Sequence, residues 1–266
     1  MFIRLCITIL LGLGLLFFYI KYLENNGIYY PIKDIGFYPS SIGLSYEETD
    51  ITTEDGCNIN GWFIPYPNAK YTLLFCHGNA GNIGDRIDKL DLLRRIGLNI
   101  FIVDYRGYGK SQGRPFENGF YLDAQAAYNY LLNTHNIKSE QIILYGESLG
   151  TAVVIDLASK KKVRAVIVEG AFSRGRDMAV KIYPFLPAFL FSNSFDSIRK
   201  ITKINVPKLF IHSRNDEVVP FALASKLYNT AGEPKEFVEI IGGHNTAFLD
   251  SKEKYVSAIA LFIEKF

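Results

Sequence analysis

Cysteine is scarce in this chain, and the three that occur are scattered at Cys6, Cys57 and Cys76. An odd, dispersed set without a C-x-x-C pair argues against both a disulfide framework and a zinc site. An excess of one charge sign is also missing, because 29 basic and 27 acidic residues leave a net charge of +2. No basic run or basic-aromatic stripe occurs. The composition therefore favours neither a nucleic-acid partner nor a bound metal.

Charge is almost absent from residues 2–20, where Arg4 is the only charged residue. An apolar run of about 19 residues matches the thickness of the hydrocarbon core of a bilayer. Tyr19 and Lys21 at its end resemble an interfacial anchor. No A-x-A-like cleavage site comes after it, so residues 1–24 are predicted to be a single-pass membrane anchor rather than a cleaved signal peptide or a buried helix. The side of the membrane stays open, because positive charges flank both ends.

The rest of the chain is long and apolar enough to bury one large core. An irregular linker is expected over residues 25–44, and the domain over residues 45–266. Two β-rich segments around Glu54-Asp55-Gly56 predict a hairpin. Six further strands and five helices are then predicted to alternate, with strands over 71–76, 99–103, 141–145, 163–168, 207–211 and 236–241, and helices over 85–96, 117–134, 149–160, 220–230 and 248–265. This alternation predicts an α/β fold with an eight-stranded, mainly parallel sheet flanked by helices.

One stretch between two predicted strands does not fit the alternation. Residues 179–194 are rich in phenylalanine and leucine but are interrupted by Pro184 and Pro187. They are too short and too interrupted for a second membrane span, and they lie where a small cap, about residues 173–200, would be inserted. Two interpretations stay open. The stretch is either a core helix under the cap, or an apolar surface that binds an acyl-like substrate or touches the bilayer.

A short glycine-flanked motif lies between a predicted strand and a predicted helix: Gly146-Glu147-Ser148-Leu149-Gly150. A sharp strand-to-helix turn strains the backbone of its central residue, and the two glycines let the strand and the helix approach closely. Such a turn lifts the serine hydroxyl above the edge of the sheet. The motif alone is common, so its meaning depends on the residues at the ends of the other strands.

Ligands of open α/β sheets bind at the carboxyl ends of the strands. Ser148 follows one predicted strand, Asp216 follows a later one, and His244 follows the last. A serine hydroxyl needs an imidazole to take its proton, and a carboxylate to orient that imidazole. The chain order Ser, Asp, His is that of a hydrolase triad on such a sheet. The sequence therefore predicts Ser148 as nucleophile, His244 as base and Asp216 as the orienting acid.

Other acidic residues compete less well for these roles. Glu169 also ends a strand and is the alternative triad acid. Asp104 is expected to cap its own loop or to pair with Arg106, and Glu147 is expected to point away from the nucleophile. The glycine-rich loop after Asp104 is not a P-loop, because an aspartate stands where the leading glycine is required. The remaining histidines are expected to be structural: His77, His135 and His212.

The loop after the strand at 71–76 begins His77-Gly78-Asn79. Acyl transfer places negative charge on the carbonyl oxygen, which needs backbone N–H donors held ready for it. One donor comes from this loop and the other from the residue after the nucleophile. The N–H groups of Asn79 and Leu149 are therefore predicted to form the oxyanion hole.

Five segments together resemble one family. They read HGNAGNIG (77–84), DYRGYGKS (104–111), GESLG (146–150), DEVVP (216–220) and GGHN (242–245). Over residues 47–266 they are similar to the membrane-anchored, α/β-hydrolase domain-containing group related to the yeast bud-emergence protein family, near the serine aminopeptidase-like hydrolases. The resemblance implies the α/β-hydrolase fold and an N-terminal signal-anchor. Thr151 departs from the family, which usually has a further glycine there. A threonine is expected to be tolerated in the first turn of the helix, although its side chain leaves less room between helix and strand.

These inferences predict a serine hydrolase that cleaves ester or thioester bonds of lipid-like acyl substrates through an acyl-enzyme, without a cofactor or metal. The resemblance implies relatives that include lysophospholipases, monoacylglycerol lipases and protein-depalmitoylating thioesterases. Two alternatives stay open: a serine peptidase of the aminopeptidase-like kind, and a membrane-tethered scaffold without activity. A leader that is cleaved would instead indicate a soluble, exported esterase.

Overall fold

The apolar runs of the sequence form the centre of an eight-stranded sheet in the computed structural model, which describes residues 1–266 apart from the side chains at positions 9, 13, 25 and 26. The strand order is β10-β9-β8-β7-β4-β6-β3-β2. The six strands from β10 to β6 run parallel, whereas β3 is antiparallel to both β6 and β2. This confirms the predicted eight-stranded, mainly parallel sheet. The strands are β2 (Glu47–Thr52), β3 (Asn58–Ile64), β4 (Thr72–Cys76), β6 (Asn99–Val103), β7 (Ile142–Glu147), β8 (Ala165–Glu169), β9 (Lys208–Ser213) and β10 (Lys235–Ile240).

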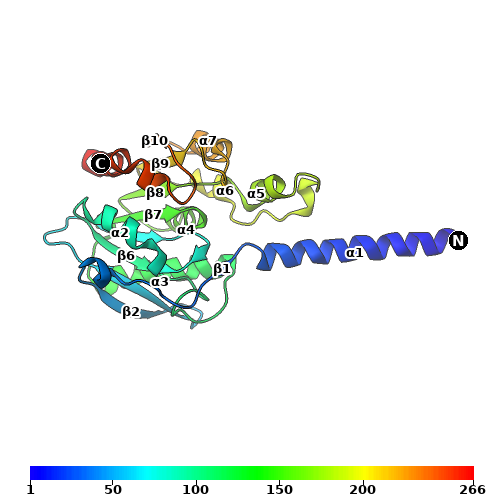
Figure 1. Ribbon diagram of the computed structural model, residues 1–266, viewed down its shortest axis with the longest axis horizontal. Coiled ribbons are helices and arrows are strands. Elements are labelled where there is room, and N and C mark those ends of the chain that lie inside the picture. Colours follow the sequence, from blue (N-terminus) through cyan, green and yellow to red (C-terminus); the bar gives the residue numbers. More distant parts are fainter.

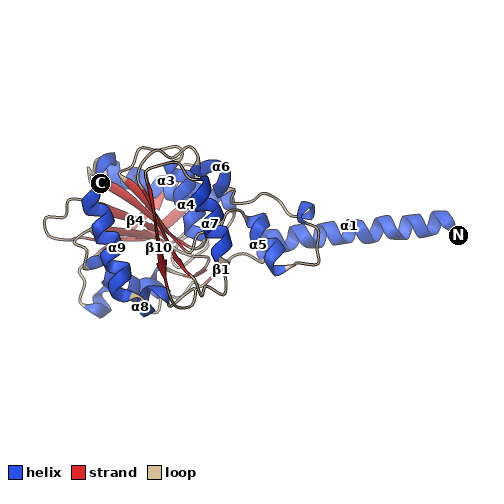
Figure 2. Ribbon diagram, turned by 90° about the horizontal axis from the view of Figure 1, so that it is seen from above, coloured by secondary structure: helices blue, strands red, loops and turns tan.

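The central strands are buried on both faces, which explains their continuous apolar runs. All five residues of β4 are buried. Leu74 packs into the apolar cluster on one face, and Leu73 and Phe75 pack into the cluster on the other. This alternation follows from the two-residue repeat of a strand. Helices cover both faces, so the sheet lies between two layers (Figure 2).

One face is covered by helices of the middle of the chain: α3 (Glu117–Asn133), α4 (Leu149–Ala158) and α7 (Phe221–Thr230). The other face is covered by η2 (Ile83–Arg86), α2 (Ile87–Arg94), α8 (Ala247–Asp250) and α9 (Lys252–Lys265). A short turn, η3 (Ser139–Gln141), precedes β7. The predicted closing helix over 248–265 is divided at Ser251. The Ser251 hydroxyl donates to Ile241 O and accepts from the Ile241 N–H, which holds the junction of α8 and α9 against the end of β10.

A single helix, α1 (Phe2–Asn26), projects from the domain, and its amino terminus is the most distant point of the molecule (Figure 1). Within the described part of the chain, Phe2–Glu24 is the one helical segment long and apolar enough to cross a membrane, and 6% of its apolar window is buried. A helix thus forms where the sequence predicts one. Its length and composition fit either a membrane anchor or a signal sequence.

The segment between α1 and β2, predicted as an irregular linker, lies against the domain. It contains β1 (Tyr30–Pro31), η1 (Pro39–Ile42) and the residues that join them. β1 pairs in parallel with β5 (Ala80–Gly81), a two-residue strand in the loop after β4. We call residues 28–34 the strap. It crosses the loop that carries Asn79.

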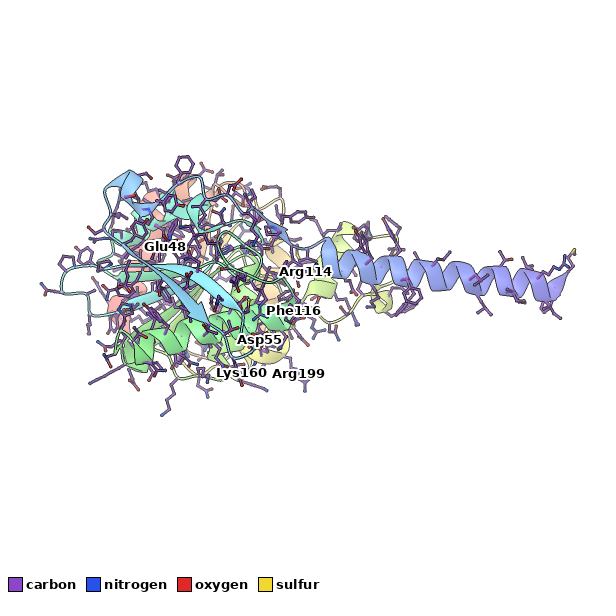
Figure 3. All side chains as sticks on the ribbon, turned by 90° about the horizontal axis from the view of Figure 1, so that it is seen from below. Glu48, Asp55, Arg114, Phe116, Lys160 and Arg199 are labelled. Carbon is purple, nitrogen blue, oxygen red and sulfur yellow. The ribbon has the colours of Figure 1, made fainter. Side chains whose placement is uncertain are left out.

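An insertion between β8 and β9 forms the cap, residues 173–200. It contains α5 (Gly175–Ile182), η4 (Ala188–Leu190) and most of α6 (Ser197–Ile201), and neither α5 nor η4 has a buried residue. The cap lies beside the domain end of α1 in the views from above and below (Figures 2 and 3). The Ser192 N–H and hydroxyl donate to Glu24 Oε1 at 2.5 and 2.9 Å, so the cap and α1 are joined directly.

Candidate active site

Ser148 occupies a strained turn between β7 and α4. Its backbone has φ 51° and ψ −115°, a conformation that residues with a side chain rarely adopt. A Cβ on Gly150 would lie 1.9 Å from Cys76 O, and a Cβ on Gly146 would lie 2.5 Å from Gly150 O. Both glycines are therefore required by close packing of strand and helix. The Ser148 N–H donates to Glu169 O at 2.8 Å, which holds the turn against β8.

The three residues predicted to act together meet at this edge of the sheet. The Ser148 hydroxyl lies 3.0 Å from His244 Nε2, and His244 Nδ1 lies 2.7 Å from Asp216 Oδ2. A carboxylate only accepts hydrogen bonds, so Nδ1 carries the proton and Nε2 is left to accept from the serine. This is the arrangement in which an imidazole can take a proton from a serine as it attacks.

Asp216 is held by two backbone donors besides His244. Its Oδ1 accepts from the N–H groups of Val218 and Val219 at 2.9 and 2.7 Å. Burial is the largest single influence and would raise the pKa of this carboxyl, but His244, the Val219 N–H and His212 together outweigh burial and keep the pKa below its usual value. His212 lies behind it, with Nε2 at 2.9 Å from Val219 O and 3.7 Å from Asp216 Oδ2. His212 therefore supports the acid rather than replacing the base.

His244 is a stronger base than a free imidazole. Burial is the largest single influence and would lower its pKa, but the hydrogen bond and charge of Asp216, with the charges of Glu147 and Glu169, together outweigh it and raise the pKa above its usual value. The His244 N–H donates to Glu217 Oε2 at 3.0 Å, which ties the loop after β10 to the loop after β9. No sequence pattern indicated this role for Glu217, because the contact joins two distant loops.

Asn79 and Leu149 line the same cavity as Ser148. Neither of their N–H groups donates to another described residue, so both are available to a bound oxygen. The strap holds Asn79 in place. Asn79 Nδ2 donates to Ile28 O at 2.7 Å, and Asn79 O accepts from the Tyr30 N–H at 3.0 Å and the Tyr108 hydroxyl at 2.7 Å. The strap was not predicted to contact the site.

The cavity beside Ser148 has a volume of about 290 Å³ and a mainly apolar lining. The last turn of α1, the strap and the cap all contribute to it. Among its described lining residues, Glu24 is the one with a charged side chain. Its apolar lining includes Leu23, Ile28, Phe172, Met178, Tyr183 and Phe191. The cavity therefore suits an apolar chain attached to a reacting group at Ser148.

A buried ion cluster lies on the other side of the turn. We use this name for Arg86, Lys89, Tyr145, Glu147, Glu169 and Tyr255. Lys89 Nζ lies 2.9 Å from Glu169 Oε2 and 3.1 Å from Glu147 Oε1, and Arg86 Nε lies 2.7 Å from Glu147 Oε2. The hydroxyls of Tyr145 and Tyr255 also bond to Glu169. Burial would raise the pKa of Glu147, but the two cations outweigh it and lower the pKa.

The ion cluster places both rival carboxylates away from the imidazole. Glu169, the alternative triad acid, bonds to Lys89 and the two tyrosines, and Glu147 points away from Ser148 as predicted. Asp104 does not pair with Arg106. It accepts from the Ile83 N–H at 3.0 Å, which caps η2.

Arg106 instead binds Asp123 and Asp55, because both carboxylates reach its guanidinium at 2.9 and 2.7 Å. His135 stacks on Phe63, and His77 Nδ1 lies 2.7 Å from Gly78 O, so both are structural as expected. Thr151 is accommodated, and its hydroxyl donates to Ser148 O at 2.6 Å. Among the described residues, no group of three or more potential ligands could hold a metal ion.

Comparison with known proteins supports the fold and the family. Residues 71–190 match the family model described as alpha/beta hydrolase fold. Alpha/beta hydrolase domain-containing protein 17B from Homo sapiens is 38% identical over 198 residues, which cover 72% of this chain and 68% of the relative. The protein YfhR from Escherichia coli K12 is 33% identical over 235 residues, covering 85% of this chain and 81% of the relative.

Among solved structures, the Pyrococcus furiosus esterase Pf2001 superposes with a TM-score of 0.76 at 21% identity, covering 89% of this chain and 99% of the esterase. This likeness shows the shared fold. The two relatives found by sequence are more than 30% identical to this chain, and each alignment covers more than two thirds of both proteins. One of them is an α/β-hydrolase domain-containing protein. The resemblance stated from the motifs is confirmed, and the chain belongs to the α/β-hydrolase family.

Proposed function

We propose that this protein is a membrane-anchored serine hydrolase that cleaves ester or thioester bonds of lipid-like acyl substrates. The observation that carries this proposal is the hydrogen-bonded series Ser148–His244–Asp216, whose serine lines an apolar cavity. Family membership makes a hydrolase the expected activity, and the esterase Pf2001 shares the fold. The serine mechanism and the lipid-like substrate are our inference from the residues.

In the acylation step, Ser148 Oγ attacks the substrate carbonyl carbon while its proton passes to His244 Nε2. The negative charge that develops on the carbonyl oxygen is met by the N–H groups of Asn79 and Leu149. The bond from the carbonyl carbon to the leaving oxygen or sulfur then breaks, and His244 gives its proton to that atom. An alcohol or thiol leaves, and the acyl group remains on Ser148.

In the deacylation step, water takes the place of the leaving group. His244 removes a proton from the water as its oxygen attacks the acyl-enzyme, and returns that proton to Ser148 Oγ as the ester bond breaks. The products are a carboxylic acid and the restored serine. Asp216 keeps the imidazole in the required tautomer through both steps. These steps need no metal or organic cofactor.

The substrate class is inferred from the lining of the cavity and from α1. An apolar cavity releases water when it binds an acyl chain, which favours lipid-like esters and thioesters over polar ones. Glu24 is the one carboxylate among the described lining residues, but Lys21 and Ser192 occupy its oxygens. A peptidase that recognises a free amino terminus would need an unoccupied carboxylate there. This observation favours esters and thioesters over the aminopeptidase alternative.

The first experiment is labelling of the membrane fraction with a fluorophosphonate probe, which reacts with activated serines. The native chain is expected to label. A Ser159→Ala control is also expected to label, because Ser159 lies at the opposite end of α4 from Ser148. Ser148→Ala is expected to lose the label. A panel of p-nitrophenyl esters and acyl thioesters of increasing chain length then defines the substrate. A folded native chain that neither labels nor hydrolyses these substrates would favour the scaffold alternative.

The anchor has its own test. N-terminal sequencing of the mature chain is expected to find residues 1–24 retained, with the protein in the membrane fraction after carbonate washing. A mature chain that begins near residue 25, recovered in the soluble fraction, would show a cleaved leader and a soluble esterase.

A further inference from the structure

The tip of the cap, residues 182–191, exposes large apolar side chains that nothing within the described chain covers. Phe185 and Phe189 are each 77% exposed, and Ile182 is 60% exposed. The tip contains no acidic or basic residue, and Lys181 directly precedes it. Phenylalanines gathered at one exposed point, with a basic residue at the edge, are typical of segments that enter the interfacial layer of a bilayer.

The position of the tip relative to α1 makes the bilayer its expected partner. The cap extends beside the domain end of α1 in three views, two of them from opposite sides (Figures 1, 2 and 3). If residues 2–20 occupy the hydrocarbon core, at 1.5 Å rise per residue, the end of α1 reaches the interfacial layer. The cap tip then lies at the same level. It has to enter the membrane by only about 5–10 Å, the usual depth of interfacial segments.

The contact between cap and α1 is specific. Glu24 in the last turn of α1 accepts two hydrogen bonds from Ser192, directly after the tip. Arg176 Nε donates to Phe191 O at 2.9 Å, which ties the end of the tip back to α5. Ile20, one turn before Glu24, is 1% exposed, although its neighbours Tyr19 and Tyr22 are exposed. The tip is therefore held beside the helix at its carboxyl-terminal end, through Ser192.

The cavity beside Ser148 lies between these same two elements. Leu23 and Gly27 line it from α1 and the residue after it, and Ile182, Tyr183 and Phe191 line it from the ends of the tip. We propose that the cap tip is a second membrane contact, and that the cavity receives the acyl chain of its substrate directly from the bilayer. The membrane contact rests on the proposed anchor, and the access route rests on the proposed hydrolase activity. The membrane contact itself can be tested separately.

Membrane insertion of the tip can be measured by fluorescence in the full-length protein reconstituted into proteoliposomes. The chain has one tryptophan, Trp62, which is fully buried in β3 and gives a constant background. In the variant Phe189→Trp, the added fluorescence is expected to be quenched at least about twofold by phospholipids brominated near the headgroup. Leu261→Trp is the matched control, because Leu261 is 65% exposed on α9, far from α1 (Figure 1). A Phe189→Trp signal that is quenched no more than the Leu261→Trp signal overturns the membrane contact.

Access from the bilayer can be measured with two substrates. The double variant Phe185→Ser, Phe189→Ser is expected to hydrolyse a long-chain ester held in the vesicle membrane about tenfold more slowly than the native protein. Its hydrolysis of a water-soluble butyrate ester is expected to stay within about twofold, because neither residue lines the cavity. Parallel loss of both activities, or loss of neither, overturns the access route.

The two substrates also separate this inference from the proposed function. If the native protein hydrolyses neither ester, the proposed function fails, while the quenching experiment still decides the membrane contact. If the native protein hydrolyses the soluble ester and Phe189→Trp is not quenched, the proposed function stands and the inference fails.

Discussion

Two environments meet at Ser148, and they differ in how tightly they are held. On one side are the triad partners and the buried ion cluster, whose charged groups are buried or nearly so and paired at about hydrogen-bond distance. On the other side is the apolar cavity between α1 and the cap, where α5 and η4 have no buried residue. Packed polar networks hold one geometry, whereas half-exposed apolar segments can adapt. The comparison suggests that the reacting atoms are fixed and the substrate-binding wall is not.

The largest effect is expected from a substitution on the rigid side, at Asp216. Asp216→Asn is expected to lower kcat by about 10³–10⁴-fold, because the imidazole loses its orienting carboxylate. His244 must be neutral to act as the base, and Asp216 raises the pKa of His244 above 6.5. The activity of the native protein is therefore expected to rise with pH through an apparent pKa above 6.5. In the variant this pKa is expected to fall, and high pH should not restore the rate. A pH profile of kcat/KM measures both effects. Asp91→Asn, at an exposed ion pair with Arg95, is the control.

The rigid side can be tested through Lys89. Lys89→Met leaves the carboxylates of Glu147 and Glu169 buried without their shared cation, so it is expected to lower the free energy of unfolding by about 3–5 kcal/mol. Lys226→Met removes a half-exposed partner of Asp177 and is expected to cost at most about 1 kcal/mol. Unfolding in detergent, followed by fluorescence, measures the difference. Equal losses in the two variants would contradict the structural role of the ion cluster.

Asn79 has two roles, because its N–H is the proposed donor to the carbonyl oxygen and its side chain bonds to the strap. Two substitutions of Asn79 separate these roles. Asn79→Pro removes the backbone N–H and is expected to lower kcat by about 10²–10³-fold. Asn79→Ala keeps that N–H and loses the bond from Nδ2 to Ile28 O, so a smaller loss is expected. Steady-state kinetics with a soluble ester measure both. If the two variants lose activity equally, the N–H of Asn79 is not the donor.

The adaptable side should give the smallest effect, on selectivity rather than on rate. Met178→Trp adds a large ring to the cavity and is expected to lower kcat/KM for long acyl chains by about tenfold. Short chains should change by less than about threefold. Leu261→Trp, on the exposed side of α9, should change neither. A uniform loss across chain lengths would show that this wall is as rigid as the polar side.

The sheet and the candidate triad could be predicted because each depends on local pattern. Strands such as β4 and β6 are continuous apolar runs. Ser148 directly follows β7, and Asp216 and His244 lie in the loops after β9 and β10. Parallel strands bring such positions to one edge, so their meeting required no knowledge of long-range contacts. The division of the closing helix at Ser251 was not predictable, because it depends on a contact with Ile241 in another element.

The contacts that support the site were missed for the same physical reason. β1 and β5 are two residues long and have no detectable periodicity. Lys89 lies among charged residues of an amphipathic helix and would be expected on its solvent face, yet its side chain is 2% exposed. Only the meeting of Glu147 and Glu169 at the ends of neighbouring strands makes a buried lysine favourable there. The pairing of Arg106 with Asp123 and Asp55, rather than Asp104, likewise depends on contacts across the fold.

The strap has a practical consequence for anyone who shortens this protein for crystallisation. A chain that begins at residue 45, where the sheet domain is predicted to start, loses the Ile28 carbonyl and the Tyr30 N–H that hold Asn79. A chain that begins at Ile28 removes α1 and keeps both contacts. The smallest unit that keeps both strap contacts to Asn79 therefore starts just after the helix, well before the first strand of the main sheet, but it lacks the cavity wall formed by Leu23 and Glu24.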